Sequence, residues 1–222
     1  ADQNIPPEFI GKLHGIQSCC RTSIVYASID LGCYWELYNP RPDSGIPDNI
    51  QRDIRDRLAI GTNVLTYATN RQLKEKLERP QVTFNTTDTT SVFRKTLQIP
   101  KISHLGGSND APNALNNLLA SLQKEAGIRV SAGTQVISLT DTLERYPVLF
   151  LHGRRTFQWS VAERQALKTF VGNGGFIFGD SICASPQFTE SFRREMRIIF
   201  PEQVLRRLPS DHEMFTNDFG GF

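Results

Sequence analysis

The sequence predicts an α/β protein built around a buried, mostly parallel sheet. Two unbroken apolar runs, YPVLFLHG at residues 146–153 and FIFGD at residues 176–180, each end in a small or polar turn. Residues 161–175, VAERQALKTFVGNGG, lie between them and carry apolar side chains at helical spacing. Continuous apolar strands joined by an amphipathic helix are typical of a βαβ unit whose strands are covered on both faces.

Length and composition indicate a globular chain that can bury a single-domain core. Of the 222 residues, 39% are hydrophobic and 22% are charged, and the formal net charge is +2. Basic residues alternate with acids, as in DIRDR at residues 53–57, so no nucleic-acid partner is expected. No apolar run is long enough to cross a bilayer, and ADQNIPPEF lacks the parts of a signal peptide. The ends, an initial Ala and a final DFGGF, suggest a processed form or a fragment.

The cysteines give no indication of a metal centre. Cys19, Cys20, Cys33 and Cys183 contain no CxxC pair, so neither a metal nor a cofactor is expected from their spacing. Their even number permits disulfides, and a chain of this length does not need them for stability, which leaves the oxidation state open.

The first third of the chain predicts one strand and one long helix. Residues 23–29, SIVYASI, are β-branched and aromatic, and Asp30 and Gly32 supply the turn that ends this strand. Residues 34–47 contain three prolines and predict a surface loop. Asp48 can cap a following helix, which we expect to continue through the ambiguous residues 62–68 to residue 77. Gly61 either interrupts this helix or marks a close contact.

Residues 81–96 are rich in Thr and predict a linker or an edge strand, which makes them the best internal boundary. Beyond them we expect strands at residues 99–105, 128–130 and 136–139. A helix should begin at Pro112, end near Gly127, and bury Leu115, Leu118, Leu119 and Leu122. After Cys183 the pattern predicts a helix with a loop-like tail beyond Pro201, and its apolar face is formed by Phe188, Phe192, Met196 and Ile199.

A ligand site is expected where the parallel strands end. Ligands of open α/β sheets bind at the carboxyl ends of the strands, and these ends carry His152, Gly153, Arg154, Asp180, Ser181 and Cys183. For catalysis the candidates are Asp180 and Ser181, with His152 or His212 as the base. The structural alternative is that Asp180 and Ser181 hydrogen-bond neighbouring loop amides.

A binding role draws on an overlapping set of residues. His152 and Arg154 could bind an anion together, and the Gly106-Gly107 turn before a helix weakly resembles a phosphate-cradling loop. Arg193 and Arg194 could clamp a carboxylate or belong to an exposed helix face. The predicted ligand-binding residues are Gly106, Gly107, Asp110, His152, Arg154, Asp180 and Cys183.

Several motifs occur in an order that resembles a bacterial family, the domain of unknown function 4159. They span residues 99–222 and comprise HLGGSNDAPNALNNLL, YPVLFLHGR, GGFIFGDSICAS, FTESFRREM and LPSDHEMF. The family is similar in fold to class I glutamine amidotransferases and to trehalose-utilisation-type proteins. The resemblance implies a flavodoxin-like three-layer α/β sandwich with no established activity. It also implies a periplasmic or envelope-associated setting, because members often belong to larger envelope proteins.

The amino-terminal part adds a second resemblance. HGIQSCCRTSIVYASIDLGCYWE and RDRLAIGTNVLTYAT, within residues 1–80, resemble the closing portion of the same family domain. Residues 97–222 resemble its opening and central portions, so the order predicts a junction of tandem copies or one permuted, composite domain. We therefore predict that the strand at residues 23–29 joins the same sheet as residues 148–152.

The resulting functional hypothesis is an amidotransferase-like domain without catalysis that binds a small ligand or a protein partner. Where the resemblance implies a nucleophilic thiol, the chain has Gly179-Asp180-Ser181, and Cys183 lies two residues further along. One alternative is a hydrolase with a Ser, Asp and His site at the strand ends, which requires nucleophile and base within hydrogen-bond reach. A second alternative is a scaffold of a bacterial envelope assembly.

Overall fold

The centre of the molecule is a seven-stranded sheet in the order β4-β3-β5-β6-β2-β1-β7. The computed structural model describes residue 9 and residues 11–18, 21–39, 45–78, 96–126, 128–131 and 133–215. The neighbouring strands from β4 to β2 are parallel, whereas β1 pairs antiparallel with both β2 and β7. The strands are β1 (Leu13–Ser18), β2 (Arg21–Ala27), β3 (Lys101–Ile102), β4 (Val136–Ile137), β5 (Val148–Gly153), β6 (Phe176–Ser181) and β7 (Arg206–Arg207).

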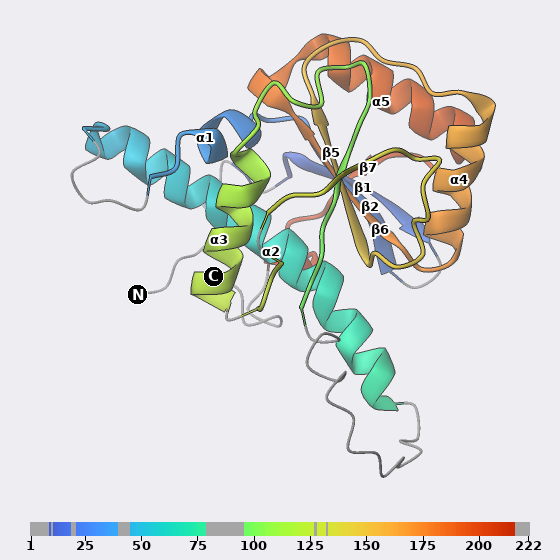
Figure 1. The fold of residues 1–222 in the computed structure, drawn as a ribbon, viewed down its shortest axis with the longest axis horizontal. Helices are drawn as coiled ribbons and strands as arrows, with labels where there is room; N and C mark the ends of the chain where they lie inside the picture. Colours follow the sequence, from blue (N-terminus) through green and yellow to red (C-terminus); the bar gives the residue numbers. More distant parts are fainter. Residues whose placement is uncertain are drawn as a thin grey trace.

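Helices cover both faces of this sheet, so the α/β prediction with a mostly parallel sheet is confirmed (Figure 1). One face carries α1 (Gly32–Glu36), α2 (Asp48–Glu78) and α3 (Ala114–Ala126), and the other carries α4 (Val161–Gly172) and α5 (Pro186–Ile199). Every residue of β5 and β6 is buried. These two strands therefore need apolar side chains on both faces, which explains their continuous apolar runs.

The layer formed by α1, α2 and α3 packs as the helical spacing predicts. The four leucines predicted for the inner face of α3 are all buried, and α2 continues without a break through residues 62–68. Gly61 marks a close contact rather than an interruption. A Cβ added at Gly61 would lie 2.6 Å from Leu118 Cδ1 and 2.6 Å from Trp35 Cζ2. The absence of a side chain at Gly61 thus lets three helices converge.

The opposite layer is fixed by a capped helix and a buried carboxylate. Ser160 and Glu163 form a capping box at the start of α4. The carboxylate of Glu195, on α5, is fully buried and accepts two hydrogen bonds from Arg164, on α4, at 2.8 and 3.2 Å. The residues predicted for the inner face of α5, Phe188, Phe192, Met196 and Ile199, are buried.

Arg193 and Arg194 form no clamp. Arg194 pairs with Glu195 at 3.5 Å and also donates to the Phe157 carbonyl, whereas Arg193 Nη2 lies 3.1 Å from His14 Nε2. The two guanidinium groups therefore contact different partners within the protein, and a shared carboxylate ligand stays a prediction.

The strand predicted at residues 23–29 is observed as β2 and lies in the same sheet as β5, with β6 between them. That prediction is confirmed, whereas the tandem or permuted order of the family portions stays a prediction. Residues 81–95 of the expected linker and Gly127 lie outside the described residues.

Other boundaries needed correction. The loop expected at residues 34–47 begins inside α1, because Asp30 Oδ1 accepts the amide of Cys33 and Trp35 is buried as an anchor. The strand expected at residues 99–105 is limited to β3, and residues 128–130 contribute only an isolated bridge between Val130 and Leu97. Asp48 is the first residue of α2 itself. The pattern also missed β1, and β7 in the tail.

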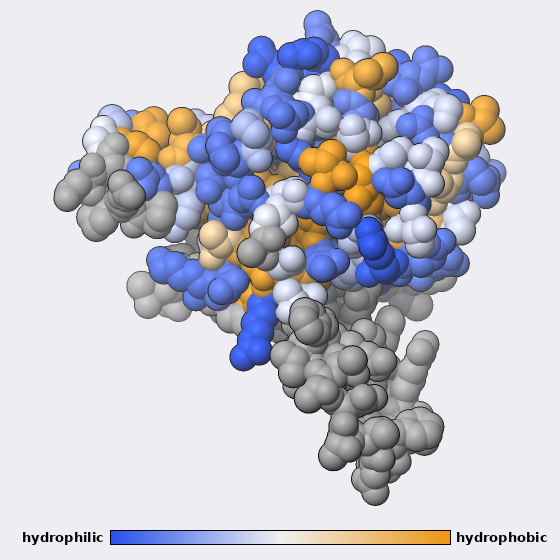
Figure 2. All heavy atoms as spheres, viewed as in Figure 1, coloured by the Kyte–Doolittle hydropathy of each residue, from blue (hydrophilic) through white to orange (hydrophobic). Residues whose placement is uncertain are grey.

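The face shown in Figure 2 is mainly hydrophilic, with apolar groups near its centre and at its edges. Exposed large apolar side chains come from six segments of the described chain, at Leu37, Leu105, Val136, Val161, Ile198 and Val204. Within the described residues, no helix combines the length and apolarity needed to cross a membrane.

Gly61→Ala should destabilise the protein by about 1–2 kcal/mol, because the overpacking cost against Trp35 and Leu118 exceeds the gain in helix propensity. Gly172→Ala is a matched control, since it also lies in a helix and an added Cβ would meet nothing within 4 Å. We expect Gly172→Ala to be neutral or to stabilise by up to about 1 kcal/mol. Urea unfolding of both variants measures the difference, and equal effects would contradict the packing at Gly61.

Candidate functional site

Asp180 lies at the carboxyl end of β6 and is fully buried. Its Oδ1 accepts the amide of Leu31 at 3.2 Å, and its Oδ2 accepts the amide of Gly32 at 3.0 Å. Burial, followed by the nearby Asp30 carboxylate, raises the pKa of Asp180 well above its usual value. The expectation that Asp180 hydrogen-bonds loop amides is confirmed, and its role in this geometry is to hold the connection between β2 and α1.

Ser181 points to the opposite face of the sheet, because successive side chains of a strand alternate. It is fully buried, its Oγ donates to the Ser185 carbonyl at 3.0 Å, and it lies 3.4 Å from Thr189 Oγ1. Tyr26 donates to the same Thr189 hydroxyl at 2.7 Å, and burial raises the pKa of Tyr26 to about 12. Ser181 thus belongs to a polar network between β6 and α5. We expected Ser181 to hydrogen-bond a loop amide, whereas it donates to a carbonyl.

His152 ends β5 directly beside Asp180 in the register of the two strands. Its Nε2 lies 2.9 Å from the Ser108 carbonyl and therefore carries the proton of that hydrogen bond. Nδ1 is buried and has no hydrogen-bond partner in the described structure. Burial, then the charge of Lys101, lowers the pKa of His152 to about 3, which keeps the imidazole neutral.

His104 and Lys101 extend this buried polar group. The amide of Gly106 donates to His104 Nδ1 at 3.0 Å, so His104 Nε2 donates to the His152 carbonyl at 2.9 Å. Burial lowers the pKa of His104 to about 4. Lys101 is buried in β3, donates to Asn109 Oδ1 at 3.1 Å, and has a pKa lowered by burial. These groups connect β3 and β5 to the loop at residues 104–113.

The hydrolase arrangement predicted from the sequence is not assembled. Ser181 and His152 point to opposite faces of the sheet, so neither can exchange a proton with the other directly. His212 lies 2.9 Å from Thr22 Oγ1, at the amino end of β2. That position is about 20 Å along the sheet from Ser181, given the rise of about 3.3 Å per residue. The structure therefore does not bring Ser181 together with either histidine.

The Gly106-Gly107 turn contacts the adjacent arginines, and its role as a phosphate-cradling loop stays a prediction. The Gly106 carbonyl accepts the amides of Arg154 and Arg155, both at 2.9 Å. Gly107 has a φ of +88°, which glycine tolerates, and turns the chain so that the Asp110 amide bonds the Gly107 carbonyl. Asp110 then pairs with Arg155 at 3.1 Å and with Arg154 at 3.8 Å.

A cavity of about 510 Å³ opens beside these arginines. Of the predicted ligand-binding residues, Arg154 and Cys183 line it, and Gly106 and Asp110 contact the lining arginines. Gly107, His152 and Asp180 are not among the lining residues. The sequence analysis missed Arg155, Ser185 and Gln187 as lining residues, although the Arg-Arg pair after β5 was a usable signal. The lining comprises Arg154, Arg155, Ile182, Cys183, Ser185, Pro186 and Gln187.

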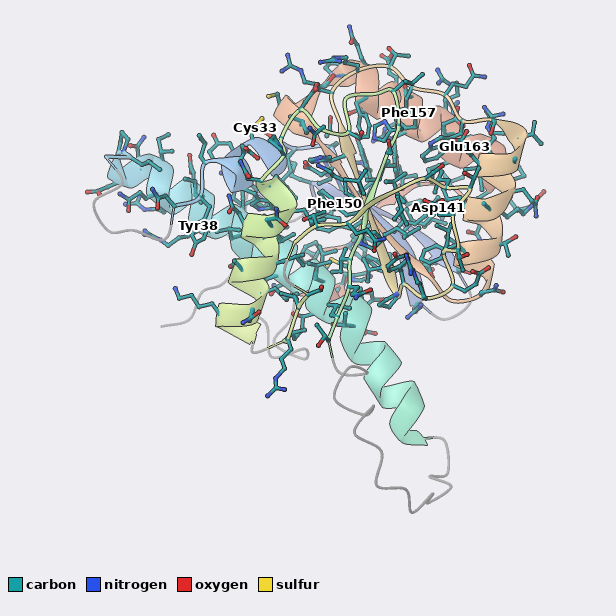
Figure 3. The ribbon with its side chains drawn as sticks, in the orientation of Figure 1. Cys33, Tyr38, Asp141, Phe150, Phe157 and Glu163 are labelled. Carbon is teal, nitrogen blue, oxygen red and sulfur yellow. The ribbon has the colours of Figure 1, made fainter. Side chains whose placement is uncertain are left out.

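The turn from β6 into α5 has an unusual backbone. Cys183 and Ala184 have φ values of 55° and 49°, in the left-handed region that costs a non-glycine residue about 1–3 kcal/mol. The Cys183 amide donates to Asp30 Oδ1 at 2.9 Å, and Asp30 Oδ1 also accepts the Cys33 amide at 3.1 Å. Figure 3 shows Cys33 on α1, at the same end of the sheet as Phe157 and the start of α5.

Asp30, Cys33 and Cys183 each offer one potential metal ligand, and these atoms lie within 4.8 Å of one another. Spacing along the sequence could not reveal this group, because 150 residues separate the two cysteines. Cysteine spacing along the sequence therefore neither predicts nor excludes a metal ion at these three residues.

The fold and the site together define an α/β domain with a cavity at the carboxyl ends of its parallel strands, the class expected from the strand pattern. Residues 98–220 match the family described as domain of unknown function (DUF4159), and the chain belongs to this family. Comparison with curated proteins and comparison with solved structures each gave no match.

Gly32→Ala should destabilise the protein by about 2 kcal/mol, because the new Cβ would displace the Asp180 carboxylate and leave buried amides without their acceptor. A Cβ at Gly32 would lie 2.5 Å from Asp180 Oδ2. In an Asp180→Ala background this clash is absent, so the same substitution should cost less than about 0.5 kcal/mol. Urea unfolding of the wild type, the two single variants and the double variant completes this double-mutant cycle. An equal cost in both backgrounds would contradict the role of Asp180.

The neutral His152 should make stability depend on pH. Its folded pKa, about 3, lies below the unfolded value, so its contribution is complete above pH 6.5 and is lost as the pH falls toward 3. When the pH is lowered from 7 to 5, the unfolding free energy of both proteins should fall. The fall for His152→Gln should be about 2 kcal/mol smaller than the fall for the wild type. Urea unfolding at both pH values tests this, and parallel losses in the two proteins would show that His152 titrates normally.

Proposed function

We propose that the protein binds a small anionic ligand, one that carries a carboxylate or phosphate group, in the cavity at the strand ends. The observation that supports this most is the pair of arginines in the cavity wall. The side chains of Arg154 and Arg155 are 55% and 64% exposed, so their guanidinium groups remain accessible from solvent. Guanidinium groups bind carboxylates and phosphates through paired, charge-assisted hydrogen bonds.

The local charge balance favours an anion. Asp110 is the carboxylate that pairs with both arginines, and its side chain is only 18% exposed. Two cations facing one carboxylate leave a net charge of about +1 at the cavity wall. The backbone bonds from Arg154 and Arg155 to Gly106 hold the positions of both residues, which reduces the entropy that ligand binding would have to offset.

The start of α5 contributes to the same wall. Ser185, Pro186 and Gln187 line the cavity, and the Ser185 side chain does not cap the helix. Ser185 Oγ instead donates to the Arg154 carbonyl at 2.6 Å. The first amides of a helix have no acceptor within the helix, and the helix dipole favours negative charge at this end. An anion held by the arginines would therefore also be favoured by α5.

The proposal extends to a non-catalytic, amidotransferase-like domain. The buried Ser181 and the neutral, separately bonded His152 argue against the hydrolase alternative. A protein partner or an envelope scaffold has less support, because the exposed large apolar side chains of the described residues are few and come from separate segments of the chain.

Inorganic phosphate and succinate should bind this cavity and raise the melting temperature, since a ligand of the folded state stabilises it. Isothermal titration at fixed ionic strength should show affinity for either probe that falls by about tenfold or more in Arg154→Gln/Arg155→Gln, given the strength of charge-assisted hydrogen bonds. Arg145→Gln is the matched control, because Arg145 stacks on Tyr146 outside the cavity lining. Loss of binding in the control as well would indicate a nonspecific charge effect.

Asp110→Asn should act in the opposite direction. Removal of the carboxylate frees both guanidinium groups, so the affinity for phosphate should rise by about threefold to tenfold. The same titration measures this change. Weaker binding in Asp110→Asn would mean that Asp110 positions the arginines for a ligand, and no binding of either probe to the wild type would refute the anion site.

A further inference from the structure

The thiols of Cys33 and Cys183 meet at the carboxyl ends of two adjacent parallel strands. Cys33 follows β2 on α1, and Cys183 follows β6, which pairs with β2 up to Ala27 and Asp180. Both cysteines are free thiols, and their sulfur atoms lie 2.7 Å apart although 150 residues separate them. The sheet register brings these distant segments together, so the contact belongs to the fold and not to a local turn.

The backbone around both cysteines orients their sulfur atoms toward each other. Asp30 Oδ1 accepts both of their amides, and this one atom sets the separation of the two loops. Cys183 adopts a left-handed conformation although its side chain is exposed and fills no space in the core. Backbone strain that is not offset by burial of the strained residue is typical of functional positions.

We propose that Cys33 and Cys183 form a redox-active modification site, at which a low-molecular-weight disulfide oxidises the two thiols to an intramolecular disulfide. The inference is independent of the anion-binding function. It adds a covalent state to the molecule, because the bond would link α1 to the turn that forms part of the cavity wall.

The exchange is balanced in atoms and electrons. The exposed Cys183 thiol loses its proton and attacks one sulfur of glutathione disulfide, which forms a mixed disulfide and releases one glutathione thiolate. Cys33 Sγ then loses its proton and attacks the Cys183 sulfur, so the bond from Cys33 to Cys183 forms and the second glutathione thiolate leaves. Two protein thiols are oxidised by two electrons, and glutathione disulfide is reduced to two glutathione molecules.

The geometry favours a disulfide over a metal ion held by Asp30, Cys33 and Cys183. Two thiolates on a tetrahedral zinc ion stand about 3.7 Å apart, as follows from a zinc to sulfur distance of about 2.3 Å. The observed 2.7 Å is much shorter and lies closer to a covalent contact.

Incubation of the full chain in glutathione buffers of increasing glutathione disulfide content tests the proposal. After free thiols are blocked with iodoacetamide, non-reducing peptide mass mapping should find the Cys33 peptide linked to the Cys183 peptide, with a loss of two hydrogen atoms. The oxidised protein should melt about 5–15 °C higher than the reduced protein, since the bond closes a long loop. Cys33→Ser and Cys183→Ser should each abolish this shift, whereas Cys19→Ser/Cys20→Ser should keep it.

Three results would overturn the proposal. The first is that both cysteines are alkylated at every glutathione ratio. The second is that either cysteine links to Cys19 or Cys20 instead. The third result is that one equivalent of zinc chloride, added to the reduced protein, protects both thiols from iodoacetamide and blocks their oxidation by glutathione disulfide. Mapping of the wild-type chain decides among these results even if a serine variant fails to fold.

Discussion

The buried carboxylate of Asp180 is the constraint on which the strand-end arrangement depends. It stands at the end of the most deeply enclosed strand and accepts two amides from the segment that leaves β2. This contact positions Asp30 beside the turn after β6, where it accepts the Cys183 amide, and it fixes the start of α1. Trp35 on α1 then packs against Phe150 and Phe178. Gly32 is needed here because any side chain would occupy the position of the carboxylate. One polar contact thus connects the sheet, the helix layer and the cavity wall.

The sequence predicted the features that depend on periodicity and missed those that depend on distant contacts. Apolar runs identified β5 and β6, and helical spacing identified the inner faces of α3 and α5, because burial on known faces fixes these patterns. The same alternation in β6 places Asp180 and Ser181 on opposite faces, so the catalytic grouping could have been rejected from the sequence. The contact between Cys33 and Cys183 could not have been predicted from the sequence, since it depends on the parallel register of β2 and β6. Short elements such as α1 and β3 carry too few residues for a periodic signal.

The folded unit is larger than the segment that matches the family. Residues 98–220 contain β3 to β7, yet β2 lies between β6 and β1 in the middle of the sheet order. Without β2, the amides and carbonyls along one edge of β6 would have no partners, and without α1 and α2 the apolar face that includes Phe150 and Phe178 would be exposed. The amino-terminal residues therefore complete the core, and the matched segment alone would be a poor choice for expression or for binding experiments.

The charge distribution at the strand ends separates a buried structural layer from an accessible binding layer. In the buried layer, burial shifts the pKa values of Asp180, His152 and His104 in the direction that favours their neutral forms. Such groups hold loops through hydrogen bonds. Arg154 and Arg155 stand outside this layer, keep their charges, and reach solvent. Accessible cations above a layer of buried, hydrogen-bonded polar groups are the arrangement that supports the proposed anion binding.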